Sequence, residues 1–335
     1  MRRSIAFLTF AALMWATWGR SPVDKRPSGN FPDLAIVPEA LPPGPVLARY
    51  LGPFRMEGAW QIKSSNAWVF GYSAMVAHTD GRLLAFNDSG HTLMFSPPGA
   101  KPSKAREKRI RFKDPIHTKA GRDVESVAYD PANRRYWLGM EGLNVVTRLS
   151  ANLKETGRVA PAGMAHWGLN TGAEAMTRLP DGRFIAIREV PPSLGEARLH
   201  DALLFSGDPV QHPDAARFQF DGPDNFSAVD MALLPDGRAL ILMRRLLWPM
   251  PLRFAGRIVI ADTARIRPGK VWPSATLASL ASVLPVDNFE AIAAVPQPDG
   301  RITVWLMSDD NAMRVLQRTL LWKLSVDPAK LPWPR

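Results

Sequence analysis

The chain contains no cysteine among its 335 residues. This absence excludes disulfide bonds, zinc–thiolate sites, iron–sulfur clusters, a cysteine nucleophile and a lipidated N-terminal cysteine. If the protein is exported, it must be stabilised by its hydrophobic core without disulfides, which a chain of this length can provide.

Several common catalytic motifs are missing as well. There is no phosphate-binding Gly-x4-Gly-Lys-Ser/Thr loop, no dinucleotide-binding fingerprint and no His-Glu-x-x-His zinc motif. The nearest approach to a Gly-x-Ser-x-Gly elbow begins at Gly71 and has Met75 in place of the final glycine. These absences argue against nucleotide-dependent chemistry and against the usual serine-hydrolase scaffold.

Helical periodicity is scarce, and the 31 prolines indicate many short elements joined by turns. Only the stretch 275–284 approaches the length and period of a helix. An α/β fold requires such helical segments between its strands. The sequence therefore favours an all-β protein.

A repeated pattern of hairpins accounts for most of the chain. Each of five units has a polar residue, an alternating apolar run, a Pro/Asp/Gly/Asn turn and a second apolar run that ends in polar residues. The units are YSAMVAHTDGRLLAFNDSG from Tyr72, VESVAYDPANRRYWLGMEG from Val124, AEAMTRLPDGRFIAIRE from Ala173, FSAVDMALLPDGRALILMRR from Phe226 and FEAIAAVPQPDGRITVWLMSDD from Phe289. Asp-Gly between apolar runs is a strong hairpin signal, and hairpins recurring at this spacing predict the blades of a β-propeller.

Five blades can be counted, and a sixth, degenerate blade remains open. Each unit continues with further strand candidates, except that the last has only TLLWKLSVD before the terminus. We expect the stretch 46–62 (VLARYLGPFRMEGAWQI) to supply the missing outer strand of that blade. Such pairing of N- and C-terminal strands would close the ring and remove a free sheet edge.

The N-terminal segment has the features of an export signal. Arg2 and Arg3 precede an apolar run from Ile5 to Trp18, which is shorter than the roughly 20 residues of a spanning helix. No clear cleavage site follows, so residues 1–19 are either a signal peptide or an uncleaved membrane tether. Residues 20–45 are proline-rich and predict an extended linker, and 46–335 predict the propeller. These features indicate a protein of the periplasm or cell envelope.

Acidic residues recur at two fixed places in the repeat. The first strand of the hairpin opens with Glu125, Glu174 and Glu290. The second strand closes with Asp88, Glu141, Glu189 and Asp309 or Asp310. A hairpin brings both places to one edge of the sheet, and the innermost strands of a propeller surround one channel. We therefore expect these carboxylates to converge at one mouth of the channel.

Carboxylates held close together repel one another unless a cation neutralises them. All seven acids, with Asp309 taken in the fifth unit, are therefore candidate ligands of Ca²⁺, which binds several oxygen atoms. Glu125, Glu174 and Glu290 are also candidate catalytic residues. The alternative is structural, because acids at strand ends often accept hydrogen bonds from loop amides.

The fourth unit departs from the acidic pattern and ends in Arg244 and Arg245. Together with Arg188, these arginines are candidates to bind an anionic group of a substrate, or equally to neutralise the acidic rim. His91 and His166 lie near the pattern and are candidate general bases. Isolated histidines are more often surface or hydrogen-bonded residues.

The phrases GRDVESVAYDPANRRYWLGMEG, NTGAEAMTRLPDGRFIAIRE and DNFEAIAAVPQPDGR resemble the phytase-like family, described as having esterase-like activity of phytase. The resemblance extends from about Gly71 to Asp327. It implies a propeller, export from the cytoplasm and hydrolysis of phosphate or other esters with calcium. The positions that match the family are Asp88 in NDSG, Glu125 in DVES, Glu174 in GAEA, Asp287 and Glu290 in DNFEA, and Asp309 in SDDN.

The formal net charge of +11 favours anionic partners. The stretch Lys101–Lys113 carries seven basic residues and suits either an anionic surface or a solvated outer strand and loop. Export argues against nucleic acid as a partner, and we expect a monomer.

The leading hypothesis from sequence is an exported hydrolase, dependent on a metal, that acts on a phosphate or other ester of an anionic small molecule. The alternatives are a non-catalytic propeller that binds a ligand or protein in the cell envelope, and a sugar-lactone hydrolase.

Overall fold

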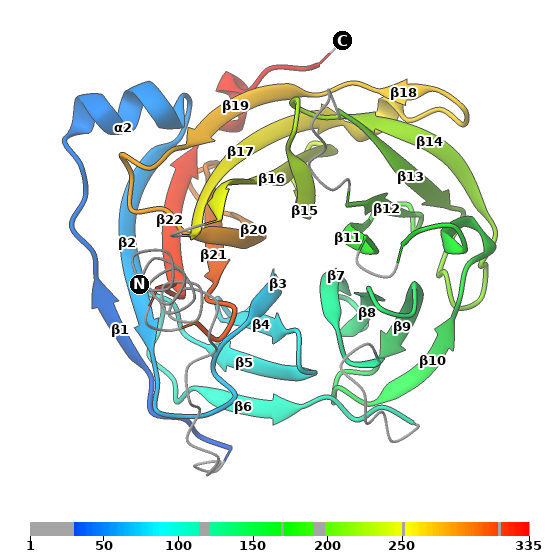
Figure 1. The fold of residues 1–335 in the computed structure, drawn as a ribbon, viewed down its shortest axis with the longest axis horizontal. Coiled ribbons are helices and arrows are strands. Elements are labelled where there is room, and N and C mark those ends of the chain that lie inside the picture. Colours follow the sequence, from blue (N-terminus) through cyan, green and yellow to red (C-terminus); the bar gives the residue numbers. More distant parts are fainter. Residues whose placement is uncertain are drawn as a thin grey trace, which may run out of the picture.

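Five small sheets stand around one axis in the computed structural model (Figure 1). The structure describes residues 30–113, 121–168, 171–189, 198–249, 252–313 and 316–334. Strands adjacent in the sequence pair antiparallel from the centre outwards, which is the arrangement of propeller blades. The prediction of an all-β, five-bladed propeller is confirmed, and the described ranges contain no sixth sheet.

Each blade begins with a strand at the channel and continues outwards. Blade one contains β3 (Tyr72–Ala77), β4 (Leu83–Asn87), β5 (His91–Phe95) and β6 (Arg106–Arg109). Blade two contains β7 (Val124–Asp130), β8 (Arg135–Met140), β9 (Val145–Leu149) and β10 (Glu155–Val159). Blade three contains β11 (Ala173–Arg178), β12 (Phe184–Arg188), β13 (Leu199–Phe205), β14 (Ala215–Asp221) and β18 (Val271–Trp272). Blade four contains β15 (Ser227–Leu233), β16 (Arg238–Pro249), β17 (Leu252–Asp262) and β19 (Ala275–Leu280). Blade five contains β20 (Asn288–Pro296), β21 (Ile302–Asp309), β22 (Leu320–Val326), β2 (Arg55–Lys63) and β1 (Ala35–Pro38).

Blade five is closed by both ends of the chain, as the sequence predicts. Strand β2 pairs antiparallel with β22, with Trp60 opposite Leu321. The expected strand is shorter at its start, because Gly44–Leu51 forms the helix α2 (Figure 1). Pro45 lies in the first turn of this helix, where its missing N–H has no intrahelical partner to lose. The helix buries Leu51 in the core between blades four and five.

The described part of the expected linker is partly structured. Strand β1 pairs with β2, with Ile36 opposite Ile62, and so adds a fifth strand to blade five. Residues 1–29, which carry the predicted export signal, lie outside the described residues. No helix among the residues described has both the length and the apolar character needed to cross a membrane.

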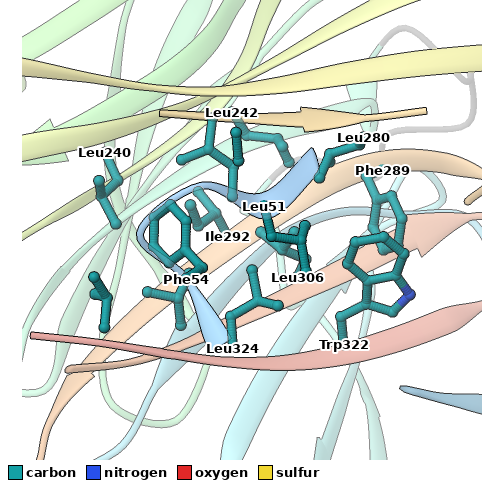
Figure 2. Close-up of a cluster of buried hydrophobic side chains, with 14 of the residues drawn as sticks. Leu51, Phe54, Leu240, Leu242, Leu280, Phe289, Ile292, Leu306, Trp322 and Leu324 are labelled. Atoms are coloured by element: carbon teal, nitrogen blue, oxygen red, sulfur yellow. The ribbon is translucent and has the colours of Figure 1, made fainter. Parts of the chain in front are cut away.

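The core lies between neighbouring blades, where alternate residues of facing strands interdigitate. Figure 2 shows the cluster between blades four and five, in which Leu242 of β16 in blade four packs with Ile292, Leu306 and Trp322 of blade five. The Trp322 indole nitrogen donates a hydrogen bond to the Pro285 carbonyl at 3.2 Å. Burial of one such side chain is worth about 1.5–3 kcal/mol. This packing holds the innermost strands β3, β7, β11, β15 and β20 in a fixed ring.

Candidate functional site

All five innermost strands carry a β-bulge at the same place. The pairing register with the second strand shifts between Tyr72 and Ala74, Val124 and Ser126, Ala173 and Ala175, Ala228 and Asp230, and Phe289 and Ala291. The extra residues are Ser73, Glu125, Glu174, Val229 and Glu290. A bulge redirects the side chain of its extra residue out of the regular alternation of a strand. The three glutamates singled out in the sequence therefore occupy structurally equivalent positions.

A second set of equivalent positions follows the bulges across each hairpin. In each blade, the residue before the bulge pairs with a residue of the second strand, and the residue that follows this partner is the second equivalent position. In blade two, for example, Val124 pairs with Met140, and Glu141 follows Met140. The five equivalent residues are Asp88, Glu141, Glu189, Arg244 and Asp309. Arg244 thus takes the place of an acid in blade four, and it is the single basic residue at these ten positions.

Two groups of carboxylates come together on blades two and three. Oxygen atoms of Asp123, Glu125 and Glu141 all lie within 4.8 Å of one another, and the same holds for Glu141, Glu174 and Glu189. Glu141 belongs to both groups. Asp123 is not among the residues predicted from the sequence, although it stands two residues ahead of Glu125 in the same DVES motif.

Burial and mutual repulsion make Glu125, Glu141 and Glu174 hard to ionise. Burial raises the pKa of Glu125 well above its ordinary value, and the charges of Glu174 and Asp123 raise it further. Burial also raises the pKa of Glu174, with added repulsion from Glu189 and Glu141. For Glu141, burial followed by Asp123 and Glu189 raises the pKa to about 7. At neutral pH this cluster must either retain protons or bind a cation.

Glu290 has a different environment because it forms an ion pair with Arg244, although burial still raises its pKa. The Arg244 guanidinium forms an ion pair with Glu290 and donates a further hydrogen bond to Glu189 at 3.1 Å. It also donates to the Asn288 side chain at 3.1 Å, while Asn288 donates to Glu290 at 2.7 Å. Burial opposes the charge on Arg244, yet Glu290, Glu189 and Glu174 together raise its pKa. Arg244 of blade four thus links Glu189 of blade three to Glu290 of blade five.

Asp88 and Asp309 meet beside a glycine on blades one and five. Gly71 has a φ of +65°, and a Cβ at this position would lie 3.0 Å from an Asp88 carboxylate oxygen and 3.8 Å from one of Asp309. Burial raises the pKa of Asp309, as do the charges of Glu290, Asp310 and Asp88. The glycine permits both the backbone conformation and the close approach of the two carboxylates.

The two histidines singled out in the sequence lie outside the innermost strands. His91 lies on β5, where its Nδ1 is 2.6 Å from Glu107 and its ring stacks on Trp68 at a centroid distance of 4.1 Å. Its side chain is buried between these partners. His166 is half exposed, and its Nε2 lies 3.7 Å from Asp201. The structure therefore brings neither ring into the two carboxylate groups.

The remaining predicted residues also have identifiable surroundings. Arg188 donates hydrogen bonds to Thr171 at 3.2 Å and to Asp201 at 3.4 Å. Among the residues described, Arg245 has no carboxylate partner. Asp287 accepts hydrogen bonds from the backbone amides of Asn288 and Arg318, which gives it a role in holding a loop. Burial raises the pKa of Asp287 to about 6.

Asp230 is a buried acid whose partners are backbone amides. Its carboxylate accepts a hydrogen bond from the Ile292 amide of blade five at 2.8 Å and from its own neighbour Met231 at 2.8 Å. A further hydrogen bond comes from the Met75 amide of blade one. Asp230 of β15 therefore connects its own strand to β20 and β3 by hydrogen bonds. Accepting hydrogen bonds from backbone amides is the structural role that the sequence analysis gave as the alternative for the acidic residues.

A family model named phytase-like, with the description "esterase-like activity of phytase", matches residues 67–312. The match covers well over half of the chain. The chain belongs to the phytase-like family. All ten equivalent positions of this phytase-like propeller lie within the matched range.

Several solved structures are similar to this chain at low identity. The Kuenenia stuttgartiensis hydrazine synthase is 13% identical, with a TM-score of 0.37, over 72% of this chain and 57% of that chain. The Myxococcus xanthus glutaminyl cyclase is 12% identical, with a TM-score of 0.46, over 82% of this chain and 97% of that one. A luciferin-regenerating enzyme is 9% identical, with a TM-score of 0.41, over 76% and 92% of the two chains. No curated protein matches the sequence.

Proposed function

We propose that this phytase-like propeller is a metal-dependent hydrolase of a phosphate or other ester carried by an anionic small molecule. The observation that supports it most is the ring of ten equivalent positions at the channel mouth. Seven of the ten are acidic and one, Arg244, is basic. A ring built only for packing would have little need for so many like charges at a buried site.

The two carboxylate groups suit a hard divalent cation such as Ca²⁺. Asp123, Glu125 and Glu141 would supply oxygen ligands on blade two, and Glu174 and Glu189 would join Glu141 from blade three. When bound, such a cation would polarise the ester oxygen and lower the pKa of a water ligand. Without a cation, the carboxylates would repel an anionic substrate, so substrate binding should itself depend on the metal.

Arg244 is the group best placed to bind the substrate's anionic oxygen. Glu189 and Glu290 hold its guanidinium from two sides, and about a quarter of its side chain remains accessible. A guanidinium fixed in this way can orient an oxyanion with little loss of side-chain entropy. Arg188 and Arg245 would contribute further positive charge at the rim.

We also propose that the protein acts outside the cytoplasm. The basic start and the apolar run of residues 5–18 support export. An N-terminal segment that is not cleaved would instead tether the propeller to the membrane.

A hydrolysis panel tests the proposed activity. Purified, chelator-treated protein is assayed on phosphate monoesters, carboxyl esters and lactones, with and without added Ca²⁺. Glu125→Gln should abolish the calcium-dependent rate, whereas Asp181→Asn, a matched change at the exposed β11–β12 turn, should leave it unchanged. Turnover of lactones alone would assign a lactone hydrolase. Calcium-dependent ligand binding without turnover on any substrate would assign a non-catalytic propeller.

A further inference from the structure

A second charged site lies between blades one and two, away from the acidic channel mouth. It is a cavity of about 190 Å³ with an apolar floor that includes Leu84, Met94 and Leu153. The basic residues that line it are Arg82, Arg106, Lys108 and Arg134. Arg82 and Arg134 follow the turns β3–β4 and β7–β8, which are at the opposite ends of these hairpins from Asp88 and Glu141. The cavity is therefore independent of the proposed hydrolytic site.

The pairing of β5 with β6 builds one wall of this cavity. Arg106 lies opposite Met94 and Lys108 lies opposite Thr92, so both basic side chains are on the same face of β6. The Arg106 guanidinium also lies over the Phe31 ring, 5.3 Å from its centroid. This cation–π contact restrains the arginine at the edge of the cavity.

The opposite wall is held in register by backbone hydrogen bonds between the two blades. The Arg111 amide donates to the Leu153 carbonyl at 2.9 Å, and the Glu155 amide donates to the Arg111 carbonyl at 2.9 Å. In Figure 1 the end of β6 accordingly lies against blade two near β10. The cavity walls thus come from sequence-distant segments that the fold joins rigidly.

Positive charge at this cavity is compensated only in part. Asp80 pairs with Arg82 at 2.6 Å. Within the described part of the chain, Arg106, Lys108 and Arg134 have no carboxylate partner. Three uncompensated cations around one cavity repel one another, and an anion placed among them would relieve that repulsion.

We propose that this cavity binds a phosphate group. Arginine side chains donate paired N–H bonds to phosphate oxygens, and the lysine adds a point charge. The apolar floor reduces access of water beneath the anion, which strengthens each charge-assisted hydrogen bond. The same chemistry is offered by a soluble phosphate ester and by the headgroup of an anionic lipid.

Binding of inorganic phosphate tests the site directly. Calorimetric titration is performed at constant ionic strength on wild type and on the cavity variant Arg106→Gln/Lys108→Gln/Arg134→Gln. The matched control Lys101→Gln/Arg109→Gln/Lys330→Gln removes the same charge from exposed residues that do not line the cavity. We expect affinity to fall at least about tenfold in the cavity variant, because several charge-assisted hydrogen bonds are lost, and to change little in the control. The cavity variant should unfold at the same or a higher temperature than wild type without phosphate, since like charges have been removed.

Sedimentation with vesicles identifies the source of the phosphate group. Binding to phosphatidic acid vesicles but not to phosphatidylcholine vesicles, lost in the cavity variant and kept in the control, assigns a lipid headgroup. Phosphate binding with no vesicle binding assigns a soluble phosphate ester. The proposal is overturned if wild type does not bind phosphate, or if the cavity variant and the control lose affinity equally.

Discussion

Replacing Glu141 by glutamine should stabilise the metal-free protein at pH 8. Glu141 is the residue shared by the two carboxylate groups on blades two and three. Glutamine keeps the size and shape of the side chain and removes its charge. The free energy of unfolding should rise because a buried charge is removed from this position and the neighbouring carboxylates no longer repel it.

The magnitude follows from the pKa of Glu141, which is about 7 in the folded protein against an ordinary value of 4.5. A raised carboxyl pKa means that the folded state binds the proton more tightly than the unfolded state. The resulting loss of stability is absent below pH 4.5, grows as the pH rises and is complete above pH 7. At 1.36 kcal/mol per pH unit it amounts to about 3.4 kcal/mol. Because Glu141 is partly exposed to solvent, we expect about 2 kcal/mol, or about 3 °C in melting temperature.

Thermal and urea unfolding of chelator-treated wild type and Glu141→Gln at pH 5 and pH 8 measure this effect. The gain should be about 2 kcal/mol at pH 8 and less than half of that at pH 5. Glu57→Gln is the matched control. It should change the free energy of unfolding in the opposite direction, because a hydrogen bond from Lys323 lowers the pKa of Glu57. A gain of equal size at both pH values, or a loss of stability at pH 8, would refute the reasoning.

Four further outcomes are expected. Added Ca²⁺ should raise the melting temperature of chelator-treated wild type by mass action, and Glu125→Gln should abolish this shift in a calcium titration followed by scanning calorimetry. Arg244→Gln should lower metal-free stability by about 2–4 kcal/mol at pH 8 and by less at pH 5, because Glu290 and Glu189 lose their counter-charge; urea unfolding at both pH values checks this. Arg238→Ala should cost about 3–5 kcal/mol in the same assay, because this buried arginine donates to the carbonyls of the C-terminal segment. An alkaline phosphatase fused after Pro45 should be active in whole cells, and a fluorescent cytoplasmic fusion without phosphatase activity would contradict export.

The five hairpins follow from local chemistry, which is why the sequence predicts them, although it left a sixth blade open. Each Asp-Gly or Asp-Pro-Ala-Asn turn favours a hairpin over four residues without help from the rest of the fold. Strand alternation on either side then determines which face is buried. Glu125, Glu174 and Glu290 can be aligned by counting back from the turn, so their equivalence is visible before any tertiary contact is known.

Contacts between sequence-distant residues needed the tertiary structure. The bulge that makes Glu125 the extra residue of β7 depends on the register with β8, and a one-residue difference in register exchanges the two faces of a strand. In blade four, the register of β15 with β16 assigns the equivalent position to Arg244 rather than Arg245. The fork of Arg244 between Glu189 and Glu290 joins residues 55 and 46 positions apart.

The amino-acid sequence by itself determined the repeat, the propeller class, the closure of the last blade and the identity of most acids at the mouth. Only the tertiary structure decided how those acids divide. Asp123, Glu125, Glu141, Glu174 and Glu189 form two overlapping groups, while Glu290 pairs with Arg244, which also binds Glu189. It also brought Arg106 and Arg134 to one cavity across a blade boundary. The physical reason is the same in both cases: hairpins form from local turns, but charges interact through distances that only the closed ring of blades establishes.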